Sequence, residues 1–167
     1  MAERDNPLAE LLVDELKDLY SAEKQILKAL PRMAKATENE ELRRAFLRHV
    51  EETKVQVERL DAIGEALGVK LTGKKCSGME GLIEEGKEIM EEDLEGSALD
   101  AGLIGAAQKV EHYEIASYGT ARAHASLLGL TKVAKLLQKT LDEEGATDKK
   151  LTTLAERIIN VEAASAA

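Results

Sequence analysis

Apolar residues recur every three to four positions along most of this chain, which is the period of an amphipathic α-helix. The pattern continues for several turns in each of four segments, and it is shorter in a fifth. Asn6 and Pro7 are a favourable pair at a helix start, and Gly68 is favourable just past a helix end. The predicted helices cover residues 7–37, 41–67, 79–93, 98–128 and 131–162.

The connections predict how these helices are arranged. A short turn joins the first two long helices, and another joins the last two, so each pair is expected to form an antiparallel hairpin. Residues 68–97 form a long crossover between the hairpins and contain the short helix over 79–93. Two hairpins with one long crossover are typical of the ferritin-like four-helix bundle. We therefore expect an all-α fold and a single domain over residues 1–167.

Composition and charge limit the kind of core, the classes of binding partner and the compartment that are expected. With one Phe, three Tyr and no Trp, the core must be mainly aliphatic. A formal net charge of −9 disfavours nucleic acid and anionic membrane surfaces, which need a basic face. The chain has no apolar run of about 18 residues and no apolar signal core near residue 1. Cys76 has no partner for an intrachain disulfide, so we expect a cytoplasmic protein.

Three carboxylates occupy positions that a helical bundle would normally fill with apolar side chains. Successive residues on a helix are about 100° apart, so each acid can be placed relative to the apolar stripe. Glu23, Glu114 and Glu144 lie at the centre of the stripes of three different long helices. Glu111 and Asp148 flank the same faces, one turn away. These acids are therefore expected to point into the bundle.

A buried carboxylate is stable only when it is neutral or paired. For any one of these residues, a buried pair with Lys or Arg is the simpler interpretation. The apolar stripes offer few inward cations, which weakens that interpretation for the whole set. Two divalent metal ions would neutralise several carboxylates at once, so the set predicts a metal site.

The helix over 41–67 presents His49, Thr53 and Gln56 toward the core, with Glu52 at the edge of the stripe and Glu51 facing away. A single His on an apolar face is often an ordinary buried histidine. His49 therefore stays open between a metal ligand, a support for a ligand and neither. Gln56 is kept as a further ligand or support.

Three other residues have side chains with possible chemical roles. His112 lies opposite the inward stripe, so it is expected either at the surface or in a contact between subunits of an oligomer. Tyr118 lies within about a turn of the acids, where it either packs at the boundary or donates a hydrogen bond to them. Cys76 follows Lys74 and Lys75, cations that can lower the pKa of a thiol. In a flexible connection, an incidental thiol is the favoured interpretation.

At these same residues the sequence resembles the YciF/YciE-like bacterial proteins, a ferritin-like family of stress-associated proteins. The likeness covers nearly the whole chain. It implies a five-helix ferritin-like fold, a tendency to dimerise and a rubrerythrin-like dinuclear metal centre. The matching stretches are Leu19–Leu30 (LYSAEKQILKAL), His49–Thr53 (HVEET), Met79–Glu85 (MEGLIEE), Ala107–Thr120 (AQKVEHYEIASYGT) and Thr140–Leu151 (TLDEEGATDKKL).

The sequence departs from the general ferritin-like pattern, which places Glu-x-x-His on two helices. Val55 and Thr147 stand where the two His would be. Glu111 and Glu114 instead form a Glu-x-x-Glu pair, as in rubrerythrin-like proteins. A site rich in oxygen and poor in imidazole suits hard ions such as Mn or Mg.

Together these features predict a cytoplasmic, homodimeric stress protein that binds two metal ions, iron or manganese, with magnesium as a further candidate. O₂ or peroxide is the expected small oxidant, in an oxidase or peroxidase reaction, if the protein is an enzyme. The alternative is a non-catalytic helical dimer that has a structural or interaction role and whose buried acids are structural. The predicted metal ligands are Glu23, Glu52, Glu111, Glu114, Glu144 and Asp148, with His49 and Gln56 as additional candidates.

Overall fold

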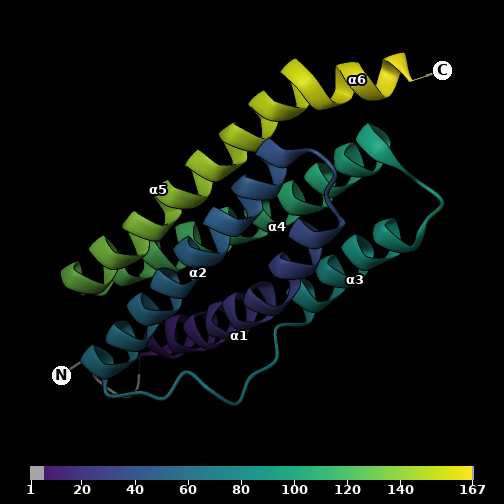
Figure 1. Cartoon of the computed structure of the whole chain (residues 1–167). Coiled ribbons are helices and arrows are strands. Elements are labelled where there is room, and N and C mark those ends of the chain that lie inside the picture. The colour runs from purple at the N-terminus through teal and green to yellow at the C-terminus, as the bar shows by residue number, and fades with distance from the viewer. Residues whose placement is uncertain (1–5, 167) are drawn as a thin grey trace.

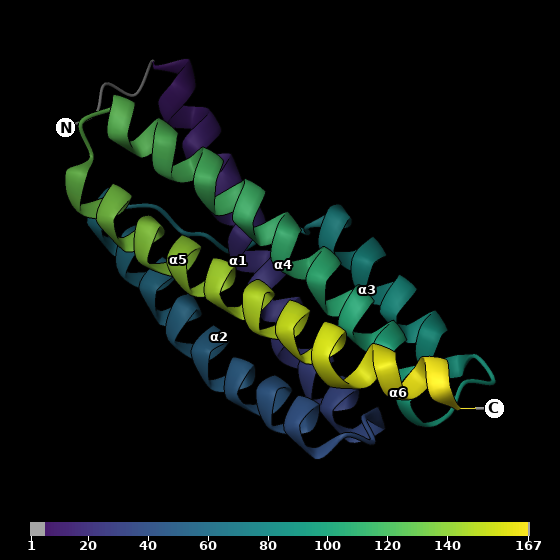
Figure 2. The ribbon, with the colours of Figure 1, turned by 90° about the horizontal axis from the view of Figure 1, so that it is seen from above.

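The computed structural model describes residues 6–166 and confirms the all-α, ferritin-like bundle (Figure 1). In this part of the chain every regular element is helical. The helix α3 lies in the crossover between two antiparallel hairpins, α1–α2 and α4–α5, and it packs against α4 and α1 (Figures 1 and 2). The elements are α1 (Pro7–Ala36), α2 (Glu40–Leu67), α3 (Ser77–Glu91), α4 (Gly96–Leu127), α5 (Thr131–Leu154), η1 (Ala155–Ile159) and α6 (Asn160–Ser165).

Local chemistry sets the helix ends. Asn6 caps α1 by accepting from the Leu8 N–H at 2.9 Å, and Asn39 caps α2 with two bonds of 3.0 Å. Gly68 ends α2 in the left-handed conformation, with a φ of 67° that costs glycine little. Pro31 lies inside α1, which nevertheless continues to Ala36.

The final helix differs from the single uninterrupted helix expected over 131–162. Residues 155–159 form a π-helical turn, η1, between α5 and α6. Ala155 and Ile159 are buried there, so the wider turn keeps both side chains on the core side. The apolar period alone does not distinguish a π turn from an α turn.

The core is divided into two apolar clusters, one toward each end of the bundle. Leu16 and Leu60 belong to one cluster, and Phe46 and Leu103 belong to the other. Between the clusters every long helix places polar side chains inside. We call these residues the polar layer: Glu23, His49, Thr53, Gln56, Glu111, Glu114, Thr140 and Glu144, all buried.

Asp100 of α4 holds the turn between α1 and α2. Its carboxylate accepts from the backbone N–H groups of Glu38 (3.0 Å) and Asn39 (2.6 Å), and the residue is buried. Asp100→Ala would remove two hydrogen bonds to a charged acceptor, which contribute about 1.5–3 kcal/mol each. We expect the free energy of unfolding in urea to fall by about 3 kcal/mol. Asp100→Asn retains one acceptor and is expected to lose less, and exposed Asp93→Ala is the control; equal values for all three would contradict this role.

None of the helices between residues 6 and 166 combines the length and the hydropathy of a membrane-spanning segment.

Candidate metal centre

Four residues of the polar layer converge at the middle of the bundle. His49 comes from α2, Glu111 and Glu114 come from α4, and Glu144 comes from α5. One ligand atom from each lies within 4.8 Å of the others, and all four side chains are buried. We call this set the acid cluster. It needs residues from three helices, so it exists only in the folded bundle.

His49 is oriented by the acids on both sides of its ring. Its Nδ1 donates to Glu52 Oε2 at 3.3 Å, which leaves Nε2 pointing into the acid cluster. Nε2 lies 3.0 Å from Glu111 Oε1 and 3.8 Å from Glu144 Oε2, without the alignment of a hydrogen bond. A carboxylate on the outer nitrogen is the usual support of a metal-binding histidine. Glu52 therefore has a geometric role here, with its side chain 39% exposed.

Glu23 and Gln56 border the acid cluster. Tyr118 donates a hydrogen bond to Glu23 Oε1 at 2.5 Å, whereas Glu23 Oε2 has no partner. Gln56 donates to Glu144 Oε1 and, at 3.2 Å, to Glu143 Oε2. The sequence left Tyr118 open between packing and hydrogen bonding, and the structure places it as a donor to an acid.

The acids in the polar layer lack the partners that burial normally demands. Their unpartnered buried atoms are Glu23 Oε2, Glu111 Oε2, both Glu114 carboxylate oxygens and Glu144 Oε2. Within residues 6–166, no Lys or Arg lies at ion-pair distance from any of these four acids. Arg59, the buried cation nearby, instead pairs with Glu143 at 3.0 Å. The interpretation of a buried Lys or Arg pair therefore fails for this set.

Burial and mutual repulsion make these carboxyls weak acids. Burial raises the pKa of Glu23 to about 7, although the Tyr118 hydrogen bond opposes the rise. Burial and then neighbouring carboxylates raise the pKa of Glu114 and of Glu144 well above the ordinary value. Burial would lower the pKa of His49, but Glu111, Glu52 and Glu144 outweigh it and raise that pKa. Without a metal ion, bound protons supply the positive charge that this site needs.

The donor set fits divalent cations. Four carboxylates and one imidazole with free lone pairs offer mainly oxygen, which suits Mn²⁺, Fe²⁺ and Mg²⁺. Metal ions would displace the bound protons and neutralise the repulsion that raises the pKa of Glu114. The polar layer is thus a site that a cation would stabilise.

Asp148, a predicted ligand, and His112, which was expected outside the site, lie next to each other. Asp148 accepts from Gln108 Nε2 at 3.1 Å and lies 3.2 Å from His112 Nε2, so its carboxylate is occupied outside the acid cluster. The His112 side chain is 67% exposed, as its position predicted. The assignment of Asp148 and Glu52 as direct ligands stays a prediction.

Cys76 differs from its expected environment. It is fully buried at the start of α3, where its Sγ lies 3.0 Å from Tyr113 Oη and 3.1 Å from Asp18 Oδ2. Burial raises the pKa of the thiol, so the possibility that Lys74 and Lys75 lower it is ruled out. The sequence neighbours are lysines, but the spatial neighbours are Tyr113 and Asp18.

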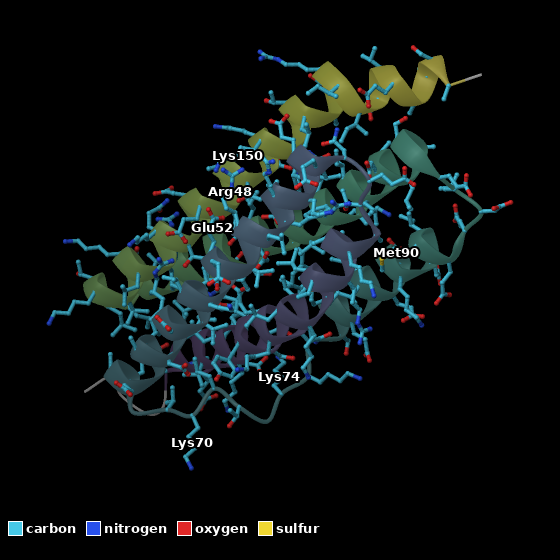
Figure 3. All side chains as sticks on the ribbon, in the orientation of Figure 1. Arg48, Glu52, Lys70, Lys74, Met90 and Lys150 are labelled. Carbon is cyan, nitrogen blue, oxygen red and sulfur yellow. The ribbon has the colours of Figure 1, made fainter. Side chains whose placement is uncertain are left out.

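A small opening reaches the acid cluster between α2 and α5. It has a volume of about 30 Å³ and is bordered by His49 and Glu111 at its inner end. Arg48, Glu52 and Lys150 surround it and lie close together in Figure 3. Because a water molecule needs about 10–15 Å³ of such space, the opening has room for water or a diatomic molecule.

Comparison with known proteins adds relatives over nearly the full length. The model of a domain of unknown function, DUF892, matches residues 7–164. Protein YciF of Escherichia coli (strain K12) is 51% identical over 157 residues, which cover 93% of this chain and 95% of YciF. The crystal structure of that stress protein superposes with a TM-score of 0.89, over 93% of this chain and 98% of the other. YcfI from Rhodopseudomonas palustris, described as a candidate structural protein, is 42% identical with a TM-score of 0.86, over 92% and 98% of the two chains.

Proposed function

This chain belongs to the DUF892 family of YciF-like proteins, and we propose that it binds two divalent metal ions in its polar layer. One observation carries the proposal. Five buried carboxylate oxygens of Glu23, Glu111, Glu114 and Glu144 have no hydrogen-bond partner, and no Lys or Arg of the described chain pairs with these acids. Leaving such groups uncompensated is costly, and metal ions are the counterions that fit this donor set.

The ligands of the proposed site are Glu111, Glu114 and Glu144, with His49 Nε2 and Glu23 completing it. The other side chains orient these ligands. Glu52 fixes the His49 ring, Tyr118 fixes Glu23 and Gln56 fixes Glu144. Glu52 and Asp148 are further ligands only if their carboxylates turn inward when metal binds.

Iron or manganese would supply redox chemistry toward a small oxidant such as O₂ or peroxide. The chain's own contribution is access to the site. The opening beside Glu52 is large enough for water or the oxidant, and the apolar clusters close the bundle toward its two ends. Because YciF is a stress protein, we propose a role in stress for this chain as well, as a cytoplasmic homodimer.

The test is the metal content and metal affinity of purified protein. We expect elemental analysis to find bound manganese or iron, and anomalous diffraction to place it in the polar layer. Glu114→Ala removes a carboxylate whose two oxygens are both unpartnered, and it is expected to weaken Mn²⁺ binding at least about 100-fold in calorimetry. Exposed Glu51→Ala on α2, whose acid pairs with Lys54, is the matched control. Equal occupancy in wild type and Glu114→Ala would contradict the assignment.

The second candidate is a structural or interaction protein without metal. It is favoured by the description of YcfI and by the raised pKa values, because protonated acids need no cation. Protein that binds no metal and whose melting temperature does not change with Mn²⁺ or Fe²⁺ would favour this candidate.

A further inference from the structure

A second and much larger cavity also reaches the acid cluster, from the opposite side to the small opening. It has a volume of about 520 Å³ and lies among α1, α3 and α4, with His49 and Glu111 at its inner end. This volume falls within the roughly 300–1,000 Å³ of small-molecule sites. Figures 1 and 2 show α3 running beside α4 and the second half of α1, where the cavity lies.

The walls of this cavity are aliphatic. Met90 lies on the side of α3 that faces α1 (Figure 3), and small residues such as Ala29 and Gly86 leave the space open. The walls between the rim and the acid cluster would therefore favour a hydrocarbon over a polar ligand. The main apolar contributors are Ile26, Leu30, Met33, Leu82, Met90 and Val110.

The rim of the cavity is cationic. Lys28 and Arg32 lie one turn apart on α1, both exposed, and neither forms an ion pair with a described residue. Lys87 of α3 adds a third cation, although it is shared with Glu84 at 3.2 Å and with Glu91 at 3.9 Å. Three cations and one acid, Glu91, lie at the rim, and the other lining acid, Glu111, lies at the inner end, in a chain whose net charge is −9. This local excess of positive charge is complementary to an anion.

We propose that this cavity binds a fatty acid, with the hydrocarbon chain along the aliphatic walls and the carboxylate at the rim beside Lys28 and Arg32. The far end of the chain then lies next to His49 and Glu111. Binding of the fatty acid uses only the walls and the rim, so it does not require a metal ion. The inference rests on the proposed metal function only in placing the end of the hydrocarbon chain next to a metal site. Single-chain phospholipids share the chemistry of an anionic head and one apolar tail, and the test separates the two sources.

The probe is dodecanoate, titrated below its micellar concentration into metal-free, full-length protein by calorimetry. We expect saturable binding, at least about tenfold tighter than that of dodecanol, which lacks the charge, or of dodecyltrimethylammonium, whose charge is reversed. Lysophosphatidate with the same tail is the second arm, and weaker binding than dodecanoate identifies the free acid as the ligand. Equal or tighter binding of dodecanol or of lysophosphatidate would overturn the assignment to a fatty acid.

Two variants test the rim and the walls of the site. Lys28→Glu with Arg32→Glu reverses the rim and is expected to weaken dodecanoate at least about tenfold while leaving dodecanol unchanged. Its control is Lys24→Glu with Lys35→Glu, which changes the charge of α1 equally but outside the cavity.

Ala29→Phe fills the cavity and is expected to remove binding of both probes, with Ala123→Phe on α4 as control. Circular dichroism checks that each variant is folded, and the rim variant still decides the question if Ala29→Phe does not fold.

The outcomes separate this inference from the metal proposal. If dodecanoate binds and no metal does, the cavity assignment stands without the metal site. If metal binds and dodecanoate does not, the cavity assignment is wrong. The same conclusion holds if dodecanoate fails to bind because a second copy of the chain covers the cavity. If the rim variant binds dodecanoate as tightly as wild type, Lys28 and Arg32 do not recognise the carboxylate and the proposal fails.

Discussion

The metal-free protein is expected to become less stable as the pH rises from about 5 to about 8. The stability of a protein falls with pH wherever its folded state binds more protons than its unfolded state. Glu23 does so between the ordinary value of 4.5 and its pKa of about 7 in the folded protein. Glu114, Glu144 and His49 act in the same direction, because each has a pKa raised well above its ordinary value.

The expected loss is large for a bundle of this size. Glu23 alone covers about 2.5 pH units, and at about 1.4 kcal/mol per unit it accounts for on the order of 3 kcal/mol. Glu52, whose pKa is lowered by the hydrogen bond from His49, opposes this trend only below about pH 4.5. Urea unfolding at several pH values in the presence of a chelator measures the slope. Saturating Mn²⁺ is expected to reduce it, and a stability that is constant or rises over this range would contradict the raised pKa values.

The helical period was sufficient to predict the burial of three central acids, although it did not identify buried Asp100. Glu23, Glu114 and Glu144 were placed at the centres of their stripes, and the structure buries all three completely, with 0% exposure. Burial of this kind follows from the direction of the Cα–Cβ bond, which the backbone alone sets. The two hairpins and the crossover followed from the lengths of the connections, because a short turn places consecutive helices side by side.

Contacts that depend on side-chain torsion angles could not be predicted from the sequence. His49 was left open, and what directs its Nε2 inward is the hydrogen bond from Nδ1 to Glu52. Asp148 lies on an inward-flanking position, yet its carboxylate turns to Gln108. Both outcomes depend on rotamers and on residues from other segments, which a helical wheel does not contain.

Cys76 shows a second limit of the sequence. Its neighbours in the chain are lysines, but the fold brings α1 and α4 against the start of α3, so its thiol meets Asp18 and Tyr113. Electrostatic environments depend on distance in space, and in a crossover segment the nearest charges come from other helices. Burial, with Asp18 adding to it, therefore raises the pKa of this thiol, whereas lysines alone would lower it.

The polar layer lowers the stability of the metal-free fold. Two apolar clusters are separated by acids whose oxygens lack partners, in a position where aliphatic side chains would pack. Proteins retain destabilising groups of this kind mainly at functional sites. It follows that removing the charge is expected to stabilise the metal-free fold and to abolish metal binding at the same time.

The double variant Glu114→Gln, Glu144→Gln tests that consequence. Each amide keeps the shape of the carboxyl and cannot ionise, so the variant loses two of the groups that take up protons on folding. We expect it to be more stable than the metal-free wild type at about pH 8, by about 2–4 kcal/mol, with a smaller difference at about pH 5. Its affinity for Mn²⁺ is expected to fall at least about 100-fold.

The matched control is Glu51→Gln with Glu65→Gln, two exposed acids on α2 that lie outside the polar layer. This control is expected to keep both the pH dependence and the metal affinity of the wild type. If the buried variant is instead less stable than wild type at every pH, the acids support the fold. In that case the structural role is the correct one, because a cluster that stabilises the protein without metal needs no cation to explain its burial.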